Sequence, residues 1–400
     1  MKLEDIALFK DEQIKKLYLE NLNTNPEDFI LKNSKKYSHI NLKPIAEQIK
    51  NYRKAKEKFP VLAKNPLILY DKIAIQQASS QLAGEFKATL FSGDKFIDLT
   101  GGMGLDTIFI SKNFKENYYC EIDFDKVTLF KYNLDELKIN NINIYCGDSI
   151  EYLKQFPDNY FDLIYIDPAR RDDVKRFIKL ELSQPNLLEI QDLLLQKSKY
   201  VLVKLAPAFD VDEIVKNVKN ITHIYAIEYN YEMKEILVVL KNQINNSIKL
   251  VAKDLKSDFI FEGNYDEIKK NIIFEKDIIN ANYTVQLHPS VIKLHLTKTF
   301  SDLNNLLCFN LNSNISLGND KLLNHRNYKV IDIFDFDEDI LKSKIKKLKI
   351  EKSAIITSNI DIDVEKLRKK LKIKDSNKTA IILTTSISSK AICIIGTKID

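Results

Sequence analysis

The stretch Asp98-Leu99-Thr100-Gly101-Gly102-Met103-Gly104 contains three of the nine glycines in this 400-residue chain, and it decides the predicted fold. It follows the apolar run KFIDLT and precedes LDTIFISKNF, so we expect a tight turn from a strand into a helix. Glycines at such a junction permit a sharp turn and a close backbone approach to a ligand, with helix amides facing it. A structural turn without a ligand is the simpler alternative.

The acid at the start of this turn bears on the kind of ligand. Dinucleotide-binding enzymes also have a glycine-rich turn between a strand and a helix. Their pattern would place a glycine at Thr107, and it does not usually place an acid three residues before the first glycine. The Asp98 carboxylate would repel a phosphate, so it favours a ligand with a cationic amino group.

Short apolar segments alternate with amphipathic ones after Lys95, which predicts a mostly parallel sheet with helices on both faces. The expected strands are KFIDLT, NYYCEID, INIYCG, FDLIYID, YVLVKLA, ITHIYAIEY and EILVVLK. Too few residues separate the last two for a crossover helix, so we expect an antiparallel hairpin. SIKLVAKDL should then complete the edge of the sheet. The predicted fold class is α/β, with a Rossmann-like seven-stranded sheet.

Acidic residues end or follow three successive expected strands. Besides Asp98, Glu121 ends the second strand and can accept hydrogen bonds from both hydroxyls of a ribose, a role for which Asp123 competes. Asp148 follows the third strand and can accept from an exocyclic amino group such as that of adenine. Its alternative role is to cap the helix SIEYLKQF. All three strands should end at the carboxyl edge, where ligands bind in open α/β folds.

The two ends of the chain have patterns of their own. Residues 1–88 carry apolar residues at helical spacing, which predicts a helical N-terminal region. The last 75 residues alternate strand and helix, with KVIDIFDF, SAIITSN, TAIILTTSI and KAICIIGTKI as strands and DEDILKSKIKKLKI and DVEKLRKKLKI as helices. Between Leu341 and Lys374 there are 12 Lys or Arg and 4 Asp or Glu, a local balance of +8 in a chain of net charge +5. This asymmetry suits a polyanionic partner, although a solvated helix face would also explain it.

The fourth expected strand ends in Tyr165-Ile166-Asp167-Pro168-Ala169-Arg170-Arg171. Together with DLTGGMG, Glu121 and GDS, this string resembles class I S-adenosylmethionine-dependent methyltransferases (EC 2.1.1.-). More narrowly, it is similar to a bacterial branch with a ferredoxin-like domain before a THUMP-like C-terminal module. The segments QQASSQLAGEFKA, VKLAPAFDVDEI, YEMKEILVVL and YTVQLHPSVIKLHLTKTFSDL extend the resemblance over most of the chain. It implies a methyltransferase domain at 89–256 after the helical region, and small α/β domains at 257–325 (ferredoxin-like) and 326–400 (THUMP-like).

The resemblance also implies a set of site residues and no metal. The residues expected to bind S-adenosylmethionine are Asp98, Thr100, Gly101, Gly102, Gly104, Glu121 and Asp148, with Gln77 and Ser80 from the segment that covers the cofactor. The residues expected to act in catalysis are Asp167, Pro168, Arg170 and Lys204.

The reaction motif departs from that of related nucleobase amino-methyltransferases. Asp167 and the carbonyl of Pro168 can accept hydrogen bonds from an amino acceptor. Ala169 replaces a second proline, and Arg170 replaces the aromatic ring on which a flipped base stacks. An arginine plane can stack or pair with phosphate instead, or form surface ion pairs. Lys204 can contact phosphate or a substrate oxygen, or cap the strand edge.

The leading hypothesis is methylation of structured RNA (tRNA or rRNA) presented by the THUMP-like module. The alternatives are methylation of a protein or small molecule, and a non-catalytic RNA-binding protein with a retained cofactor fold. The four cysteines are scattered, the first residues lack the apolar run of a signal peptide, and no segment approaches the roughly 20 apolar residues of a membrane helix. A cytoplasmic protein without a membrane partner is therefore expected.

Overall fold

The structure is a computed structural model, and it describes residues 1–400 except 78–79, 171–179, 244–246, 269–280, 387–389 and 400. The chain forms two compact units. The first comprises Met1–Phe209, Glu213–Ile221 and Val238–Ile244, and the second comprises Asp210–Asp212, Thr222–Leu237 and Asn245–Asp400. Among the described residues, no helix combines the length and apolar character needed to cross a membrane.

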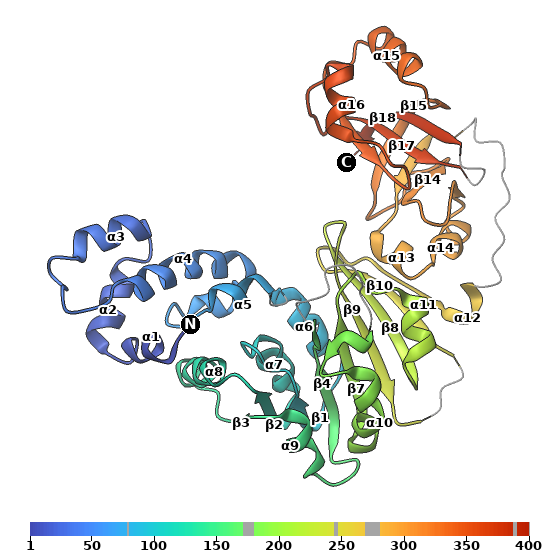
Figure 1. Ribbon diagram of the computed structural model, residues 1–400. Helices are drawn as coiled ribbons and strands as arrows, with labels where there is room; N and C mark the ends of the chain where they lie inside the picture. The colour runs from blue at the N-terminus through green and yellow to red at the C-terminus, as the bar shows by residue number, and fades with distance from the viewer. Residues whose placement is uncertain (78–79, 171–179, 244–246, 269–280, 387–389, 400) are drawn as a thin grey trace. The chain divides into compact units, whose positions relative to one another are not determined.

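The N-terminal region is helical, as the sequence predicts (Figure 1). Its elements are α1 (Leu3–Leu8), α2 (Glu12–Glu20), α3 (Pro26–Asn33), α4 (Lys43–Lys58), the 3-10 turn η1 (Leu62–Lys64), α5 (Lys72–Gln77) and α6 (Gln81–Leu90). The start of α3 shows why a helix begins there. The Asn25 side chain accepts a hydrogen bond from the Glu27 amide, and Pro26 occupies the first helical position. Apolar side chains of these helices pack with Leu129 and Tyr132 in one buried cluster.

Five parallel strands form the part of the large sheet that holds the candidate site. They are β1 (Gly93–Asp98), β2 (Phe114–Glu121), β3 (Ile142–Cys146), β4 (Phe161–Ile166) and β7 (Ser198–Leu205), in the order β3-β2-β1-β4-β7. The elements between them are α7 (Leu105–Ile110), η2 (Ser111–Asn113), α8 (Phe124–Leu137), α9 (Ser149–Lys154), β5 (Ala169–Arg170), η3 (Leu180–Leu182), β6 (Ser183–Gln184) and α10 (Leu187–Lys197). The strand order reverses between β1 and β4, which places the topological switch point of the sheet at the end of β1.

The sheet contains the seven expected strands, a strand formed by SIKLVAKDL and one further strand, in the order β11-β10-β8-β9-β7-β4-β1-β2-β3. β8 (Ile221–Tyr229) and β9 (Glu232–Lys241) are joined by Asn230 and Tyr231, whose φ angles of 53° and 67° suit a two-residue hairpin turn. β10 (Lys249–Asp254) pairs in parallel with β8, and β11 (Ile260–Asn264) pairs antiparallel with β10. The expectation that SIKLVAKDL forms the edge is therefore wrong, because Asp254 accepts hydrogen bonds from Lys256 and Ser257 in a turn that brings the chain back as β11.

A second sheet lies in the C-terminal half, in the order β13-β14-β12-β15-β18-β17-β16. Its strands are β12 (Tyr283–Gln286), β13 (Leu307–Cys308), β14 (Ile315–Gly318), β15 (Arg326–Asp335), β16 (Ala354–Thr357), β17 (Thr379–Thr385) and β18 (Ala391–Ile399). The helices of this half are α12 (Tyr265–Ile268), α13 (Pro289–Lys293), α14 (Thr297–Leu303), α15 (Glu338–Lys347) and α16 (Val364–Leu371), and α11 (Val211–Asn217) lies between β7 and β8 of the large sheet. β12, before the expected boundary at 325, pairs with β15 after it. The domain boundaries stay a prediction.

The strand and helix pattern expected for the last 75 residues is confirmed. Leu341 and Ile345 of α15 and Leu367 and Leu371 of α16 are buried in one cluster with side chains of β17 and β18. β17 and β18 form the expected closing antiparallel pair. The lysines of both helices are left on the faces that do not enter this core.

His288 and Glu228 form a buried hydrogen-bonded pair in the second unit. Nδ1 of His288 lies 2.6 Å from Oε1 of Glu228, and its Nε2 lies 3.0 Å from the carbonyl oxygen of Asn324. The ring therefore has an acceptor beside each of its nitrogens. The imidazole ring stacks on Phe259, with 3.8 Å between ring centroids, and on Tyr231, with 4.6 Å.

Asp254 lies beside this pair. Possible ligand atoms of Glu228, Asp254 and His288 lie within 4.8 Å of one another, all in buried side chains. Hydrogen bonds already account for the arrangement, because Asp254 accepts from the backbone amides of Asn230 and Lys256 at 3.2 and 3.1 Å. The expected lack of a metal stays a prediction.

Replacing His288 by alanine would leave the Glu228 carboxylate, which is 0% exposed, without its imidazole partner. We expect the free energy of unfolding to fall by about 1–3 kcal/mol because a buried polar group loses its partner, as measured by denaturant unfolding followed by circular dichroism. His39→Ala is the control, because His39 is exposed and its loss should change stability by less than about 0.5 kcal/mol. Equal losses in both variants would contradict the stabilising role of the pair.

Candidate active site

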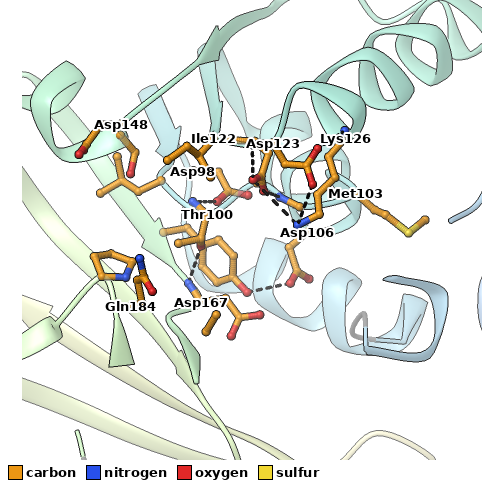
Figure 2. A pocket seen from close by; sticks show the side chains of 18 of the residues that line it. Asp98, Thr100, Met103, Asp106, Ile122, Asp123, Lys126, Asp148, Asp167 and Gln184 are labelled. Atoms are coloured by element: carbon orange, nitrogen blue, oxygen red, sulfur yellow. Dashed lines mark hydrogen bonds and ion pairs between the residues drawn. The ribbon is translucent and has the colours of Figure 1, made fainter. Parts of the chain in front are cut away.

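A cavity of about 1010 Å³ opens at the carboxyl edge of the parallel strands, at the switch point of the sheet (Figure 2). The turn after β1 forms one wall, and the ends of β2, β4 and β7 and the segment after β3 contribute others. Gln184 of β6 also lines it, and this short strand pairs antiparallel with β5 directly after the reaction motif. The sequence-predicted acids therefore meet at one cavity.

The three glycines of the turn have different structural roles. A Cβ atom on Gly101 would lie 2.0 Å from the ring of Tyr119, and one on Gly104 would lie 2.0 Å from the ring of Phe130. Gly104 also has a φ of +72°, a backbone angle that residues with a side chain rarely adopt. Gly102 differs, because the nearest heavy atom to an added Cβ is the Thr100 carbonyl oxygen at 3.8 Å. Gly101 and Gly104 therefore pack the turn tightly, and Gly102 leaves open space where a ligand can approach the backbone.

Asp98 is buried beneath the turn, with a relative exposure of 1%. Its Oδ1 accepts a hydrogen bond from the Thr100 amide at 2.9 Å, and its Oδ2 accepts from the Thr107 hydroxyl at 2.6 Å. Burial raises the pKa of this carboxyl to about 7, although both hydrogen bonds act to lower it. Within the protein, the Asp98 carboxyl orders the turn through these two hydrogen bonds. Its predicted contact with a cationic ligand stays a prediction.

Glu121 ties the end of β2 to the same turn. Its Oε2 accepts from the Gly102 amide at 2.9 Å, and its Oε1 accepts from the Asp123 amide at 3.0 Å. The side chain is 9% exposed and lines the cavity. Asp123, the competing candidate, caps α8 by accepting from the Asp125 amide at 2.9 Å. Both acids line the cavity, and the role of either toward a ribose stays a prediction.

Asp148 lines the cavity and also caps a helix. Its Oδ1 accepts from the amides of Ile150 and Glu151 at 2.8 and 3.1 Å, at the start of α9. The capping alternative is thus confirmed. The side chain is exposed, and a carboxylate offers about four acceptor positions, so an amino group can bind it as well.

Asp167 and Lys204, predicted separately as catalytic residues, form an ion pair. The Asp167 amide donates to the Thr100 hydroxyl at 2.7 Å, which joins the reaction motif to the turn after β1. Both side chains line the cavity, and Lys204 is near the end of β7. Pro168 follows Asp167 and is half-buried.

Three other predicted positions are less well defined. The side chains of Gln77 and Arg170 lie outside the described part of the structure, as does all of Arg171. Ser80 caps α6 by accepting from the Ala83 amide at 3.3 Å, and it is not among the described residues that line the cavity. The roles expected of these side chains toward a cofactor or substrate stay predictions.

Sequence reasoning missed a charged network next to the turn. Nζ of Lys87 lies 2.9 Å from Oδ1 of Asp106, and the Tyr165 hydroxyl donates to Oδ2 of Asp106 at 2.7 Å (Figure 2). Lys87 is 0% exposed. Burial acts to raise the pKa of Asp106, but the charges of Lys87 and Lys204 and these hydrogen bonds lower it below its ordinary value. Asp106 is therefore held ionised at the cavity wall.

One signal in the sequence could have revealed this network. Lys87 falls on the buried face of α6 with Ala83 and Gly84, where a lysine requires an acidic partner. Asp106 gives no comparable signal, because an acid in the first turn of a helix is common for electrostatic reasons alone.

A family model described as THUMP domain-like matches residues 325–398. A protein of Sulfurisphaera tokodaii, named as a cobalt-precorrin-6B C(15)-methyltransferase (decarboxylating), is 31% identical over 117 residues. This match covers 28% of the chain and 60% of that protein, so the chain spans less than two thirds of its length. An uncharacterised S-adenosylmethionine-dependent methyltransferase of Mycobacterium tuberculosis is 22% identical over 319 residues, covering 79% of the chain and 84% of the relative.

The fold is shared over the whole chain with a solved structure. A Porphyromonas gingivalis protein, whose crystal structure bears the name of a methyltransferase, superposes with a TM-score of 0.85. The match covers 100% of both chains at 22% sequence identity. This likeness establishes the fold.

The cavity fits S-adenosylmethionine. Its volume of about 1010 Å³ is sufficient for a nucleoside carrying an amino-acid chain. The backbone at Gly102 is open to a ligand, and three carboxylates line the cavity at or after the ends of β1, β2 and β3.

The buried Asp98 carboxyl predicts a specific pH dependence of stability. Its pKa of about 7 in the folded chain lies above the ordinary 3.8, so the native state keeps a proton that the unfolded chain has released. Asp98 therefore costs stability as pH rises from about 4 to about 7. We expect Asp98→Asn to gain stability relative to wild type between pH 5 and pH 8, by about 1.4 kcal/mol for each pH unit below the folded pKa.

Denaturant unfolding at both pH values tests this expectation. Asp28→Asn removes an exposed acid and should differ from wild type by the same amount at both. A stability difference between Asp98→Asn and wild type that does not change with pH would show that Asp98 is not protonated in this range.

The nine-stranded sheet, the glycine turn with its acids, and the match over the whole chain agree on one fold. The chain has the fold of the class I S-adenosylmethionine-dependent methyltransferases, and a THUMP domain-like family model matches its residues 325–398.

Proposed function

We propose that the protein transfers a methyl group from S-adenosylmethionine to a base of structured RNA, and that the THUMP-like domain binds this RNA. The observation that carries the proposal is the exposed lysine surface of that domain. The same chain contains the cavity at the carboxyl edge of the parallel strands, which fits the cofactor. A cytoplasmic location accords with the four free cysteines and is part of the proposal.

The lysine surface is formed by α15, α16 and the residues that follow each helix. Its exposed members are Lys342, Lys346, Lys347, Lys349, Lys352, Lys366, Lys369, Lys370, Lys372 and Lys374. Two of them bond to acids, Lys342 to Asp339 at 3.0 Å and Lys370 to Glu338 at 2.8 Å. The positive charge exceeds what these neighbouring acids offset, which favours a polyanion over a merely solvated face.

The cofactor would be held by the turn and the strand ends. Asp98, Thr100, Gly101, Gly102 and Gly104 shape the pocket for its amino-acid end, Glu121 accepts from the ribose, and Asp148 accepts from the adenine amino group. When bound, S-adenosylmethionine supplies a methyl group already activated on a sulfonium, so the protein needs to position the acceptor rather than activate the donor.

Asp167 is the residue best placed to orient an amino acceptor. Its amide bond to Thr100 fixes it relative to the cofactor turn, and its ion pair with Lys204 keeps the carboxylate at the cavity wall. The carboxylate and the Pro168 carbonyl can accept hydrogen bonds from the acceptor nitrogen and stabilise the positive charge that develops on it. Arg170 supplies a planar cation close to this point in the sequence, for a base or a phosphate.

Transfer of a radiolabelled methyl group to fractionated cell extract tests the reaction. We expect wild-type protein to label RNA from cells that lack this protein, and Asp167→Ala to label it at least about tenfold more slowly. The control is Asp192→Ala, an exposed acid of α10 paired with Lys219, which should label at the wild-type rate. Label found only in protein or small molecules would replace RNA as the substrate, and no label despite cofactor binding would favour a binding protein.

The salt dependence of RNA binding tests the lysine surface. Changing Lys346, Lys347 and Lys349 to glutamine should reduce the slope of log affinity against log salt by about 0.7–0.9 for each phosphate that the variant no longer neutralises. The matched control changes Lys32, Lys35 and Lys54, three exposed lysines of the N-terminal region. Substitution is preferable to truncation, because removing β15 would take a strand from the shared sheet. Equal slopes in both variants would show that this surface does not bind RNA.

A further inference from the structure

The wall of the cavity that follows the reaction motif consists of residues other than those assigned to the cofactor. From η3 to the first turn of α10, it lines the cavity with Glu181, Gln184, Pro185, Asn186 and Glu189. The β5–β6 pair sets Ala169 opposite Gln184, and Ala169 comes two residues after Asp167. Figure 2 shows Gln184 and Asp167 on the same side of Thr100, away from Asp148. This wall is therefore close to the carboxylate that is proposed to orient the methyl acceptor.

Hydrogen bonds within the chain hold this wall in place. The Ser183 hydroxyl, which is buried, donates to the Leu180 carbonyl at 2.6 Å and accepts from the first amide of α10 at 3.3 Å. Asn186 caps α10, and its side-chain amide donates to Oε1 of Glu189 at 2.8 Å. The backbone at Gln184 therefore lies between two anchored residues.

The Gln184 side chain is an uncharged group of this wall that a ligand can reach. It is exposed and lines the cavity, and in the described part of the chain its amide makes no hydrogen bond. Asn186 and Glu189 differ, because they bond to each other. A glutamine amide offers two N–H donors and a carbonyl acceptor. Gln184 can therefore form hydrogen bonds to a methyl acceptor that contacts Asp167.

The charges around the cavity disfavour a phosphate at this wall. Acidic side chains outnumber lysines by ten to two among the described residues that line the cavity. Lys204 forms an ion pair with Asp167, and Lys126 lies 4.0 Å from carboxylate oxygens of Glu121 and Asp123. These acids repel a phosphate, whereas an uncharged base enters without that repulsion. The phosphates of a bound RNA would therefore stay outside the cavity.

The Asp167 and Gln184 side chains together fit an uncharged base that carries an amino group. A cationic amine would also be attracted by the acids, but its protonated nitrogen has no lone pair to accept a methyl group. Asp167 can accept a hydrogen bond from the amino group of a base, and the Gln184 NH2 group can donate to the lone pair of a neighbouring ring nitrogen. Adenine, cytosine and guanine carry an amino group beside such a nitrogen, whereas uracil has no amino group.

We propose that Gln184 is a specificity-determining residue for the methyl transfer. It binds the ring nitrogen next to the amino group of the acceptor base, while Asp167 binds the amino group itself. This inference rests on the proposed function, since it requires a base of RNA as the substrate. It adds a second contact to the acceptor and restricts the base to adenine, cytosine or guanine.

Methylation of RNA from cells that lack this protein tests the inference with two variants. Gln184→Leu removes the donor at similar size, and we expect kcat/KM for this RNA to fall about 3- to 10-fold. Gln184→Glu sets a carboxylate against the lone pair of the ring nitrogen, so kcat/KM should fall further than in Gln184→Leu. A merely structural role of this exposed side chain would give the opposite order, because glutamate has the shape of glutamine.

Two controls accompany these variants. Gln196→Leu changes another exposed glutamine, which donates to Asp158 at 3.0 Å and is not among the described residues that line the cavity. Its kcat/KM should stay within about twofold of wild type. Calorimetric titration with S-adenosylhomocysteine should give affinities within about twofold of wild type for both Gln184 variants, which shows that each is folded with an intact cofactor site.

Digestion of the labelled RNA to nucleosides gives an independent readout of the acceptor. We expect the methyl group on the exocyclic amino nitrogen of adenosine, cytidine or guanosine. Label on uridine, on a ring carbon or ring nitrogen, or on a ribose hydroxyl would overturn the inference, because none of these acceptors presents an amino group to Asp167.

The remaining outcomes separate this inference from the proposed function. Wild-type kcat/KM in both Gln184 variants, higher activity in Gln184→Glu than in Gln184→Leu, or weaker binding of S-adenosylhomocysteine in either variant would overturn the role of Gln184 alone. Wild-type protein that labels no RNA, or labels only protein, would contradict the proposed function and this inference with it.

Discussion

The close packing of the turn between β1 and α7 is the constraint on which the site depends. The rings of Tyr119 and Phe130 stack with 4.0 Å between their centroids, and the Cα atoms of Gly101 and Gly104 lie against them where no side chain fits. The Tyr119 hydroxyl donates to the Gly102 carbonyl at 2.6 Å. The rings therefore fix the backbone of the turn from below.

This rigid turn then holds the ends of the neighbouring strands. The Gly102 amide donates to the Glu121 carboxylate at the end of β2, and the Thr100 hydroxyl accepts from the Asp167 amide after β4. Acids that are far apart in sequence thus become parts of one wall. Two acids of this wall differ in charge. Burial favours the neutral form of Asp98, whereas Lys87 keeps Asp106 ionised. Asp98 thus orders the turn, and Asp106 keeps a charge at the cavity wall.

Local patterns predicted the glycine turn, the acids at the strand ends and the strand-helix alternation, because each depends on a few adjacent residues. The network of Lys87, Asp106 and Tyr165 could not be predicted, since it forms only when α6, α7 and β4 pack together. β11 was also missed, because IFEGN is short and polar and depends on β10 for its pairing. The pairing of Asp167 with Lys204 likewise depends on the adjacency of β4 and β7, which no single segment encodes.

The central claim is that the cavity at this turn binds S-adenosylmethionine through the acids at the strand ends. Calorimetric titration of wild-type protein and Glu121→Gln with S-adenosylhomocysteine tests it most directly. The account predicts one site per chain in the wild type and at least about tenfold weaker binding in the variant, because the amide can accept only on one side. Wild-type affinity in Glu121→Gln would contradict it, since the cofactor would then lie elsewhere.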